Sequence, residues 1–225
     1  IGIECLLAPD LETAYPIAQQ LNQLNVERRQ VEAEMKQQAM SALQHVQLQA
    51  DSLPAALVMF DEQWHQGVIG IVAGRLKEQF HRPSLVFAPD EDGIHIKGSA
   101  RSIEGIHIRD TIEQVAEQYP HLVSHFGGHA AAAGLTLRKE NFDEFKTVFI
   151  QSIAEMDENL FLATLWTDGE LTDATLHLQT LDWIDRLGPW GQKFPIPQFE
   201  GRFKVMDYRW LKDQHLKLKV SLGQQ

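Results

Sequence analysis

The sequence has almost no cysteine, no long hydrophobic run and a deficit of basic residues. Its one cysteine, Cys5, excludes a disulfide within the chain and favours a reducing, cytoplasmic location. No apolar segment approaches the roughly 20 residues that a transmembrane helix needs, so we expect no membrane partner. The net charge of −11 argues against a surface that binds polyanions over its whole extent.

The negative charge is unevenly distributed along the chain. Residues 181–225 contain eight Lys or Arg and five Asp or Glu, a net charge of +3, so residues 1–180 carry −14. The C-terminal segment can therefore attract an anionic ligand locally although the average charge is negative. The chain opens on Ile1 rather than on methionine, and we interpret it as a piece of a longer protein.

The pattern of apolar residues predicts a long helix followed by an α/β domain. Apolar positions at three-to-four spacing indicate a helix over 11–48, where Pro16 would break or kink the first turns. Strands and helices then alternate, which predicts a sheet with helices on its faces. We expect strands at 55–60, 84–88, 93–100 and 131–137, and helices at 67–80, 110–119 and 142–153.

The helix expected after residue 141 carries the clearest local signals. Asn141 can cap it, Glu144 lies three residues further on, and an apolar stripe at helical spacing predicts a buried face that includes Phe145 and Phe149. Beyond Asp157 the chain turns at 168–169, forms a short helix at 178–187 and alternates as strands at 199–208 and 216–220. We therefore expect a connector at 1–50, an α/β domain at 51–157 and a β-rich module at 158–225.

The segment FGGHAAAAG at 126–134 combines two glycines, one histidine and a run of small side chains. Gly127 and Gly128 can turn their N–H groups toward one anion, His129 can add a directional donor, and the alanines leave space. The anion that such a nest usually holds is phosphate. The alternative is a tight turn into a buried strand, with His129 as a core histidine.

A second candidate site lies at 98–102, where a predicted strand ends. Ser99, Arg101 and Ser102 offer two hydroxyls and a guanidinium that can fork around one phosphate. The alternative is an ordinary strand-to-loop turn with a surface arginine. Two further patterns are weaker: small residues at 67–74 favour close helix packing over a phosphate site at a helix N-terminus, and histidines recur every four residues at 121, 125 and 129, a spacing that metal ligands can use.

Three blocks of the sequence together resemble a known family. WHQGVIGIVA at 64–73, KGSARS at 97–102 and FGGH at 126–129 resemble, in order and spacing, the DHH-associated domain of the RecJ family of single-strand exonucleases. The resemblance implies a mixed sheet flanked by helices, preceded by a long connector helix and followed by a partial OB-like module. NVERR at 25–29 resembles the family's connector, which makes Arg28 a candidate DNA contact, and LGPWG at 187–191 is similar to the start of its OB barrel.

The resemblance also implies how the chemistry is divided. RecJ-like enzymes degrade single-stranded DNA from the 5′ end with Mn²⁺ or Mg²⁺, held by Asp and His residues of an N-terminal DHH domain. No Asp-His-His occurs here, so we expect the metal and the catalytic residues outside this chain. By the family's motifs, the phosphates of the DNA would be bound by Ser99, Arg101, Ser102, Gly127, Gly128 and His129.

The C-terminal module should add affinity for the single strand through cations and exposed rings. The candidate cations are Lys193, Arg202, Lys204, Arg209, Lys212, Lys217 and Lys219, of which we single out Lys204, Arg209 and Lys217. The candidate stacking rings are Trp190, Phe194, Tyr208 and Trp210, most of which we expect in the core. We thus expect the substrate-binding part of a 5′-to-3′ exonuclease of DNA repair and recombination. The alternatives are a phosphodiesterase of short oligonucleotides or cyclic dinucleotides, and a non-catalytic nucleic-acid-binding module. The sequence does not decide whether a single-strand-binding protein or a helicase is a partner.

Overall fold

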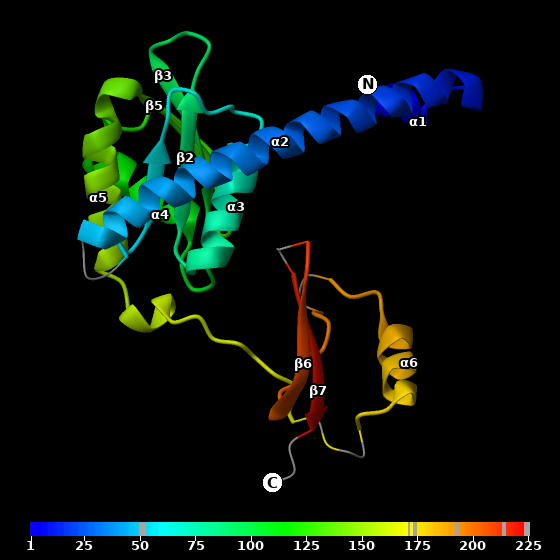
Figure 1. The fold of residues 1–225 in the computed structure, drawn as a ribbon. Helices are drawn as coiled ribbons and strands as arrows, with labels where there is room; N and C mark the ends of the chain where they lie inside the picture. Colours follow the sequence, from blue (N-terminus) through cyan, green and yellow to red (C-terminus); the bar gives the residue numbers. More distant parts are fainter. Residues whose placement is uncertain (50–52, 171, 173–174, 192–193, 213–214, 223–225) are drawn as a thin grey trace. The chain divides into compact units, whose positions relative to one another are not determined.

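The computed structural model describes residues 1–49, 53–170, 172, 175–191, 194–212 and 215–222, with the side chains of 42–49 and 222 excepted. The chain divides into two compact units, residues 1–163 and 164–225 (Figure 1). No helix in the described ranges is long and apolar enough to cross a membrane.

Two helices open the first unit, α1 (Gly2–Leu6) and α2 (Leu11–Gln49). The break predicted at Pro16 is wrong, because α2 continues through it. Pro16 lies so near the start of the helix that it removes only one early backbone hydrogen bond. Further along α2, Met35 and Ala39 are buried against the neighbouring helix α3 (Ile69–Phe80), which anchors this end of α2 to the domain.

The first unit is built on a five-stranded mixed sheet with strand order β1-β2-β3-β5-β4. Strands β1 and β2 pair in parallel, and the other neighbours pair antiparallel. This arrangement confirms the expected α/β fold. The strands are β1 (Leu57–Phe60), β2 (Ser84–Pro89), β3 (His95–Arg101), β4 (His125–His129) and β5 (Ala132–Arg138).

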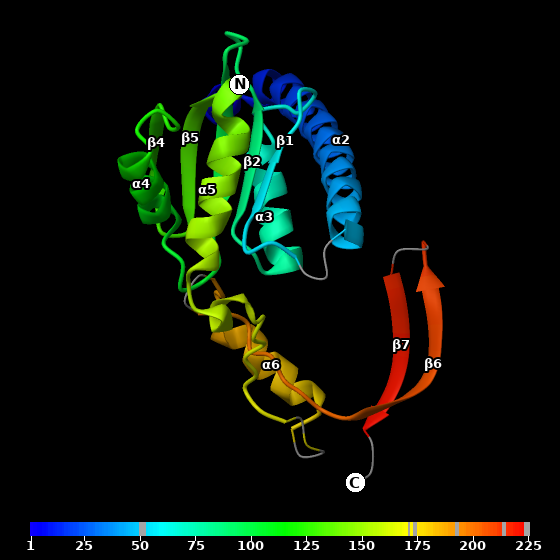
Figure 2. The same ribbon diagram turned by 90° about the vertical axis from the view of Figure 1, so that its left-hand side faces the viewer.

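Each face of the sheet packs against its own helices, as Figures 1 and 2 show. On one face, α3 and α2 bury a core that includes Val72, Leu76 and Val86. On the other face, α4 (Ile108–Gln118) and α5 (Phe142–Ala154) enclose a larger core. Phe145 and Phe149 of α5 are fully buried there, which confirms the predicted apolar stripe.

The alternative interpretation of 126–129 as a tight turn is wrong, and so is the predicted cap at Asn141. Residues 126–129 are part of the edge strand β4, and the chain turns instead at 130–131, between β4 and β5. His129 is exposed and is not a core histidine. Asn141 does not cap α5 through its side chain, because its amide donates to the carbonyl of His121 at 2.7 Å.

Short 3₁₀ helices η1 (Lys139–Asn141) and η2 (Glu158–Phe161) flank α5. The second unit contains the expected short helix α6 (Leu178–Leu187) and an antiparallel hairpin of β6 (Phe203–Leu211) and β7 (His215–Leu222). All side chains of β6 are exposed, so within this unit Tyr208 and Trp210 are not core residues.

Candidate functional site

Strand β3 alternates between the two faces of the sheet. Ile96, Gly98 and Ala100 are buried, and Ile96 and Ala100 belong to the core beneath α4 and α5. Ser99 and Arg101 therefore lie on the opposite face, the face that carries α3. Helix α3 covers this face where it packs over β2 and β3. On the same face, the residues Gly134 of β5 and Gly127 and His129 of β4 are exposed.

The strand register brings the two predicted phosphate-binding segments together. Arg101 pairs with Ala132 of β5, which pairs with His129 of β4. Directly paired residues of adjacent strands lie on the same face of a sheet, so Arg101 and His129 share the face that carries α3. In the next row, Ser99 pairs with Gly134, which pairs with Gly127. We call the surface formed by Ser99, Arg101, Gly127, His129, Ala132 and Gly134 the open face.

Two glycines leave the open face without side chains at its centre. A Cβ built on Gly127 would have no heavy atom within 4 Å, and one built on Gly134 would meet only the carbonyl of Gly98 at 3.9 Å. Neither glycine has a positive φ, so the backbone does not require glycine at either position. A glycine inside a strand often marks a place where a ligand approaches the backbone closely.

Gly128 has a different role from its neighbour. It pairs with the buried Ala133 on the opposite face, has a φ of 145°, and a Cβ there would lie 2.4 Å from the carbonyl oxygen of Ala132. The hairpin geometry therefore requires glycine at this position, and the structure does not bring Gly128 to the open face.

Arg101 is the cation of the open face that has no carboxylate partner. Its Nη1 donates to Ser99 Oγ at 3.0 Å and to the carbonyl of Ala100 at 2.9 Å. Within the described ranges no carboxylate lies within 4 Å of its guanidinium. By contrast, other arginines of this unit do pair with Asp or Glu: Arg28, Arg75, Arg109 and Arg138. Arg101 thus keeps its charge and its remaining N–H groups for another anion.

Lys97, on the same face of β3, provides the contrast. Its ammonium lies 2.9 Å from the carboxylate of Asp90. The hydrogen bond to Asp90 raises the pKa of Lys97, and the hydrogen bond from Lys97 lowers the pKa of Asp90. The pair is locally neutral, so the positive end of this face is at Arg101.

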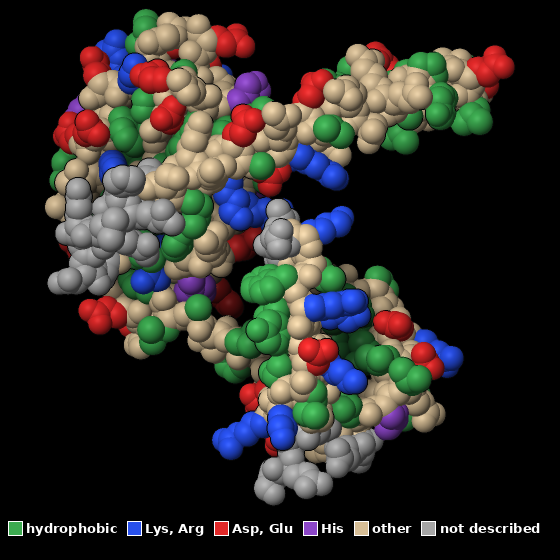
Figure 3. All heavy atoms as spheres, viewed as in Figure 1, with side chains coloured by type: hydrophobic (Ala, Val, Ile, Leu, Met, Phe, Trp, Pro, Cys, Tyr) green, Lys and Arg blue, Asp and Glu red, His purple; other side chains and the backbone are tan. Residues whose placement is uncertain are grey.

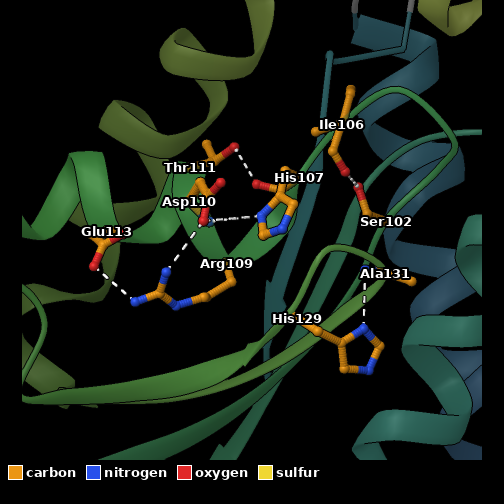
Figure 4. Close-up of polar contacts among 9 residues, drawn as sticks. All are labelled: Ser102, Ile106, His107, Arg109, Asp110, Thr111, Glu113, His129 and Ala131. Carbon is orange, nitrogen blue, oxygen red and sulfur yellow. Dashed lines mark hydrogen bonds and ion pairs between the residues drawn. The ribbon is translucent and has the colours of Figure 1, made fainter.

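His129 presents a hydrogen-bond donor at the other side of the open face. Its Nδ1 accepts a hydrogen bond from the backbone N–H of Ala131 at 3.3 Å (Figure 4). A neutral imidazole that accepts at Nδ1 carries its proton on Nε2. The hairpin tip is itself held by backbone hydrogen bonds, from Ser102 to the carbonyl of Ala131 and from Ile108 to the carbonyl of Ala130. The ring is therefore placed with Nε2 as a donor.

Ser102 does not join the open face. Its side chain is 7% exposed, and its hydroxyl donates to the carbonyl of Ile106 at 2.8 Å (Figure 4). Because this bond uses its only proton, we assign Ser102 a structural role in holding the hairpin tip. Arg28 is likewise engaged elsewhere, since its guanidinium binds Asn25 and Glu32 on its own helix.

The hairpin of the second unit has one basic face and one apolar face. Arg209 is directly opposite Lys217, and Lys204, opposite Ser221, lies on the same face. Tyr208 and Trp210 lie on the other face. In Figure 3, Lys, Arg and hydrophobic side chains all reach the surface over this hairpin. The sequence candidate Lys193 lies outside the described residues. Trp190 stacks on Phe194, with ring centroids 4.7 Å apart.

The three regularly spaced histidines do not share a helical face. His121 lies in the loop before β4 and its ring contacts Glu144 at 3.3 Å, whereas His125 and His129 are the two ends of β4. Among the residues that the structure describes, no three His, Cys, Asp or Glu side chains gather closely enough to hold a metal ion.

Comparison with known proteins identifies both units. Residues 53–155 match the DHHA1 domain and residues 167–225 match the RecJ OB domain. The single-stranded-DNA-specific exonuclease RecJ of Haemophilus influenzae is 44% identical over 223 residues, which are 99% of this chain and 39% of that protein. RecJ of Escherichia coli is 39% identical, over 98% of this chain and 38% of that protein.

A solved structure is similar over both units. RecJ of Thermus thermophilus in complex with Mg²⁺ has a TM-score of 0.78 and 28% identity, covering 96% of this chain and 32% of that chain. A structure of the same protein in complex with Mn²⁺ has a TM-score of 0.76. The chain spans about two fifths of the length of the curated relatives it matches. It belongs to the RecJ family and comprises a DHHA1 domain followed by residues of the RecJ OB domain.

Proposed function

We propose that this chain is the substrate-binding part of a 5′-to-3′ single-stranded-DNA exonuclease of DNA repair and recombination, and that its open face binds a phosphate of the DNA. The observation that carries the proposal is the unpaired guanidinium of Arg101 on one exposed face with His129, in a chain whose net charge is −11. A cation kept free of carboxylates in so acidic a chain is suited to an anionic ligand.

The donors of the open face suit a phosphodiester. Arg101 can offer two N–H groups to two phosphate oxygens, and His129 can donate from Nε2. Ser99 accepts from Arg101 and has its own proton to donate. The centre of the face, at Gly127, Ala132 and Gly134, has no polar side chain that could read a base. Binding there would therefore depend on the backbone of the DNA and not on its sequence.

We further propose that catalysis belongs to residues outside this chain. The Thermus RecJ structures hold Mg²⁺ or Mn²⁺. The described residues here do not fit such an ion, because they contain no cluster of metal-ligating side chains. A DHH domain, joined through residues 1–50, would supply the metal site, while the open face holds and orients the phosphodiester. Fixed donors lower the entropic cost of reaction by pre-orienting the substrate.

The second unit would supply general affinity for the single strand. Lys204, Arg209 and Lys217 lie on one face of the hairpin, where they can neutralise successive phosphates. The match of residues 167–225 to the RecJ OB domain supports an exonuclease over a phosphodiesterase of short substrates or a non-catalytic binding module.

The test is a pair of arginine variants in the full-length protein. Arg101→Ala should lower kcat/KM for single-stranded DNA roughly ten- to a hundredfold, the effect of losing a charge-assisted contact of about 1.5–3 kcal/mol. Arg109→Ala is the matched control, because Arg109 is already paired with Glu113 at 2.8 Å. It should leave cleavage unchanged. Wild-type cleavage by both Arg101→Ala and His129→Ala would show that the open face is structural.

A further inference from the structure

Helix α3 meets the open face at a glycine. Gly70 lies in the first turn of α3, and a Cβ built there would lie 2.9 Å from Nη2 of Arg101 and 3.0 Å from Oγ of Ser99. The third nearest atom is the guanidinium carbon of Arg101 at 3.7 Å. The three nearest atoms that such a side chain would meet thus belong to the two polar side chains of β3 on the open face.

Another glycine of the same helix has no such contact. Gly74 lies four residues further along α3, and a Cβ there would have no heavy atom within 4 Å. Gly98 of β3 also has close neighbours, but these are the ring of Phe87 and the side chain of Leu135, both in the hydrophobic core. Gly70 is therefore distinguished by the chemistry of its neighbours.

A side chain at position 70 would leave the helix and the strand in place but would displace the guanidinium of Arg101. A separation of 2.9 Å is too short for a carbon next to a nitrogen, so one of the two must move. The far end of a long arginine side chain moves at little cost, whereas the helix and the strand are fixed by their packing. The guanidinium would leave its place beside Ser99 and Ala100, while the helix would gain from losing a glycine.

We propose that Gly70 is a positioning residue for Arg101 and Ser99. The absence of a side chain lets the guanidinium lie next to the first turn of α3, within hydrogen-bond distance of Ser99 Oγ and the carbonyl of Ala100. In that place the guanidinium keeps the N–H groups of Nε and Nη2, which neither Ser99 nor Ala100 uses. The effect on DNA binding rests on the proposed function of that face, but the effect on the position of Arg101 does not.

The experiment compares Gly70→Ala with Gly74→Ala in this chain by two readouts. The first is the NMR resonance of the Arg101 Nε–H group, assigned by its absence in Arg101→Ala, which should shift in Gly70→Ala and stay in place in Gly74→Ala. The second is the affinity for a fluorescein-labelled oligothymidylate, measured by anisotropy, which Gly70→Ala should weaken at least about threefold. Both variants should keep or raise the melting temperature.

A double variant separates positioning from a general disturbance. If Gly70 acts through Arg101, Gly70→Ala should cause no further loss of affinity in the Arg101→Ala background. An Arg101 resonance that is unmoved in Gly70→Ala, or an equal loss of affinity in both backgrounds, would overturn the positioning role. Oligothymidylate binding that is unchanged in Arg101→Ala would instead refute the proposed function of the open face, whatever the resonance shows.

Discussion

Replacing the two central glycines of the open face by alanine should make the protein more stable and a weaker DNA binder. Neither added Cβ would meet an atom closer than 3.9 Å, and neither glycine has a positive φ. Glycine within a strand costs about 0.5–1 kcal/mol relative to alanine, so Gly127→Ala with Gly134→Ala should gain about 1–2 kcal/mol. For a protein of this size that is a rise of roughly 2–8 °C in melting temperature.

The same two methyl groups should oppose the ligand. They would occupy the space directly above the backbone in the row of Ser99, beside the row that holds Arg101 and His129, where we place the phosphate and its sugar. We expect the affinity for a labelled oligothymidylate to fall roughly tenfold, equivalent to about 1.4 kcal/mol. Melting followed by circular dichroism and binding followed by fluorescence anisotropy, on the same samples, measure both effects.

Gly128→Ala serves as the control for the stability argument. Its φ of 145° and the 2.4 Å separation from the Ala132 carbonyl oxygen predict a loss of stability, about 1–3 kcal/mol from backbone strain alone. The reasoning is refuted if Gly134→Ala lowers the melting temperature, since the fold would then need that glycine. It is equally refuted if the stabilised double variant binds DNA as tightly as the wild type.

Three further predictions concern other parts of the chain. Lys217→Glu should replace the like-charge pair with Arg209 by an attractive one, and should flatten the salt dependence of single-strand binding by about 0.7 for each phosphate that is no longer neutralised; an unchanged slope would contradict this. Hydrogen bonds from the backbone and ring of His95 and from the backbone of Ile94 hold the pKa of Asp92 at about 2, below its usual 3.8. Its stabilisation is therefore complete above about pH 3.8 and is lost as the pH falls toward 2, so Asp92→Asn should make acid unfolding followed by circular dichroism less steep in that range. Arg82→Ala removes a donor 2.9 Å from the carbonyl of Phe161 and a guanidinium 4.9 Å from its ring, and should speed limited proteolysis around residues 158–163.

Local patterns predicted the elements that bury regularly spaced side chains. Phe145 and Phe149 recur at helical spacing and are fully buried in α5, and β5 alternates between buried and accessible residues as a half-covered strand should. Strand β4 was missed because the sequence around Gly127 and Gly128 has low strand propensity. Its conformation depends on backbone pairing with β5, which no local pattern contains.

The candidate site was predictable in its residues but not in its geometry. Arg101 and His129 stand out in the sequence because their neighbours are small or polar. That they share a face follows from the register of β3, β5 and β4, and register is a long-range property. The same holds for Ser102, whose hydroxyl is used by Ile106, and for Gly70, whose importance depends on where a Cβ would lie.

The position of β4 at the edge of the sheet has a consequence for the dynamics of binding. Edge strands open locally at lower free energy than central ones, and their amide hydrogens exchange sooner. The open face joins a donor on the inner strand β3 to a donor on the outermost strand β4. A phosphate that bridged Arg101 and His129, as we propose, would hold the edge of the sheet to its interior. Substrate release would then be coupled to fraying of residues 125–129, and slowed exchange at these amides would report the occupied state.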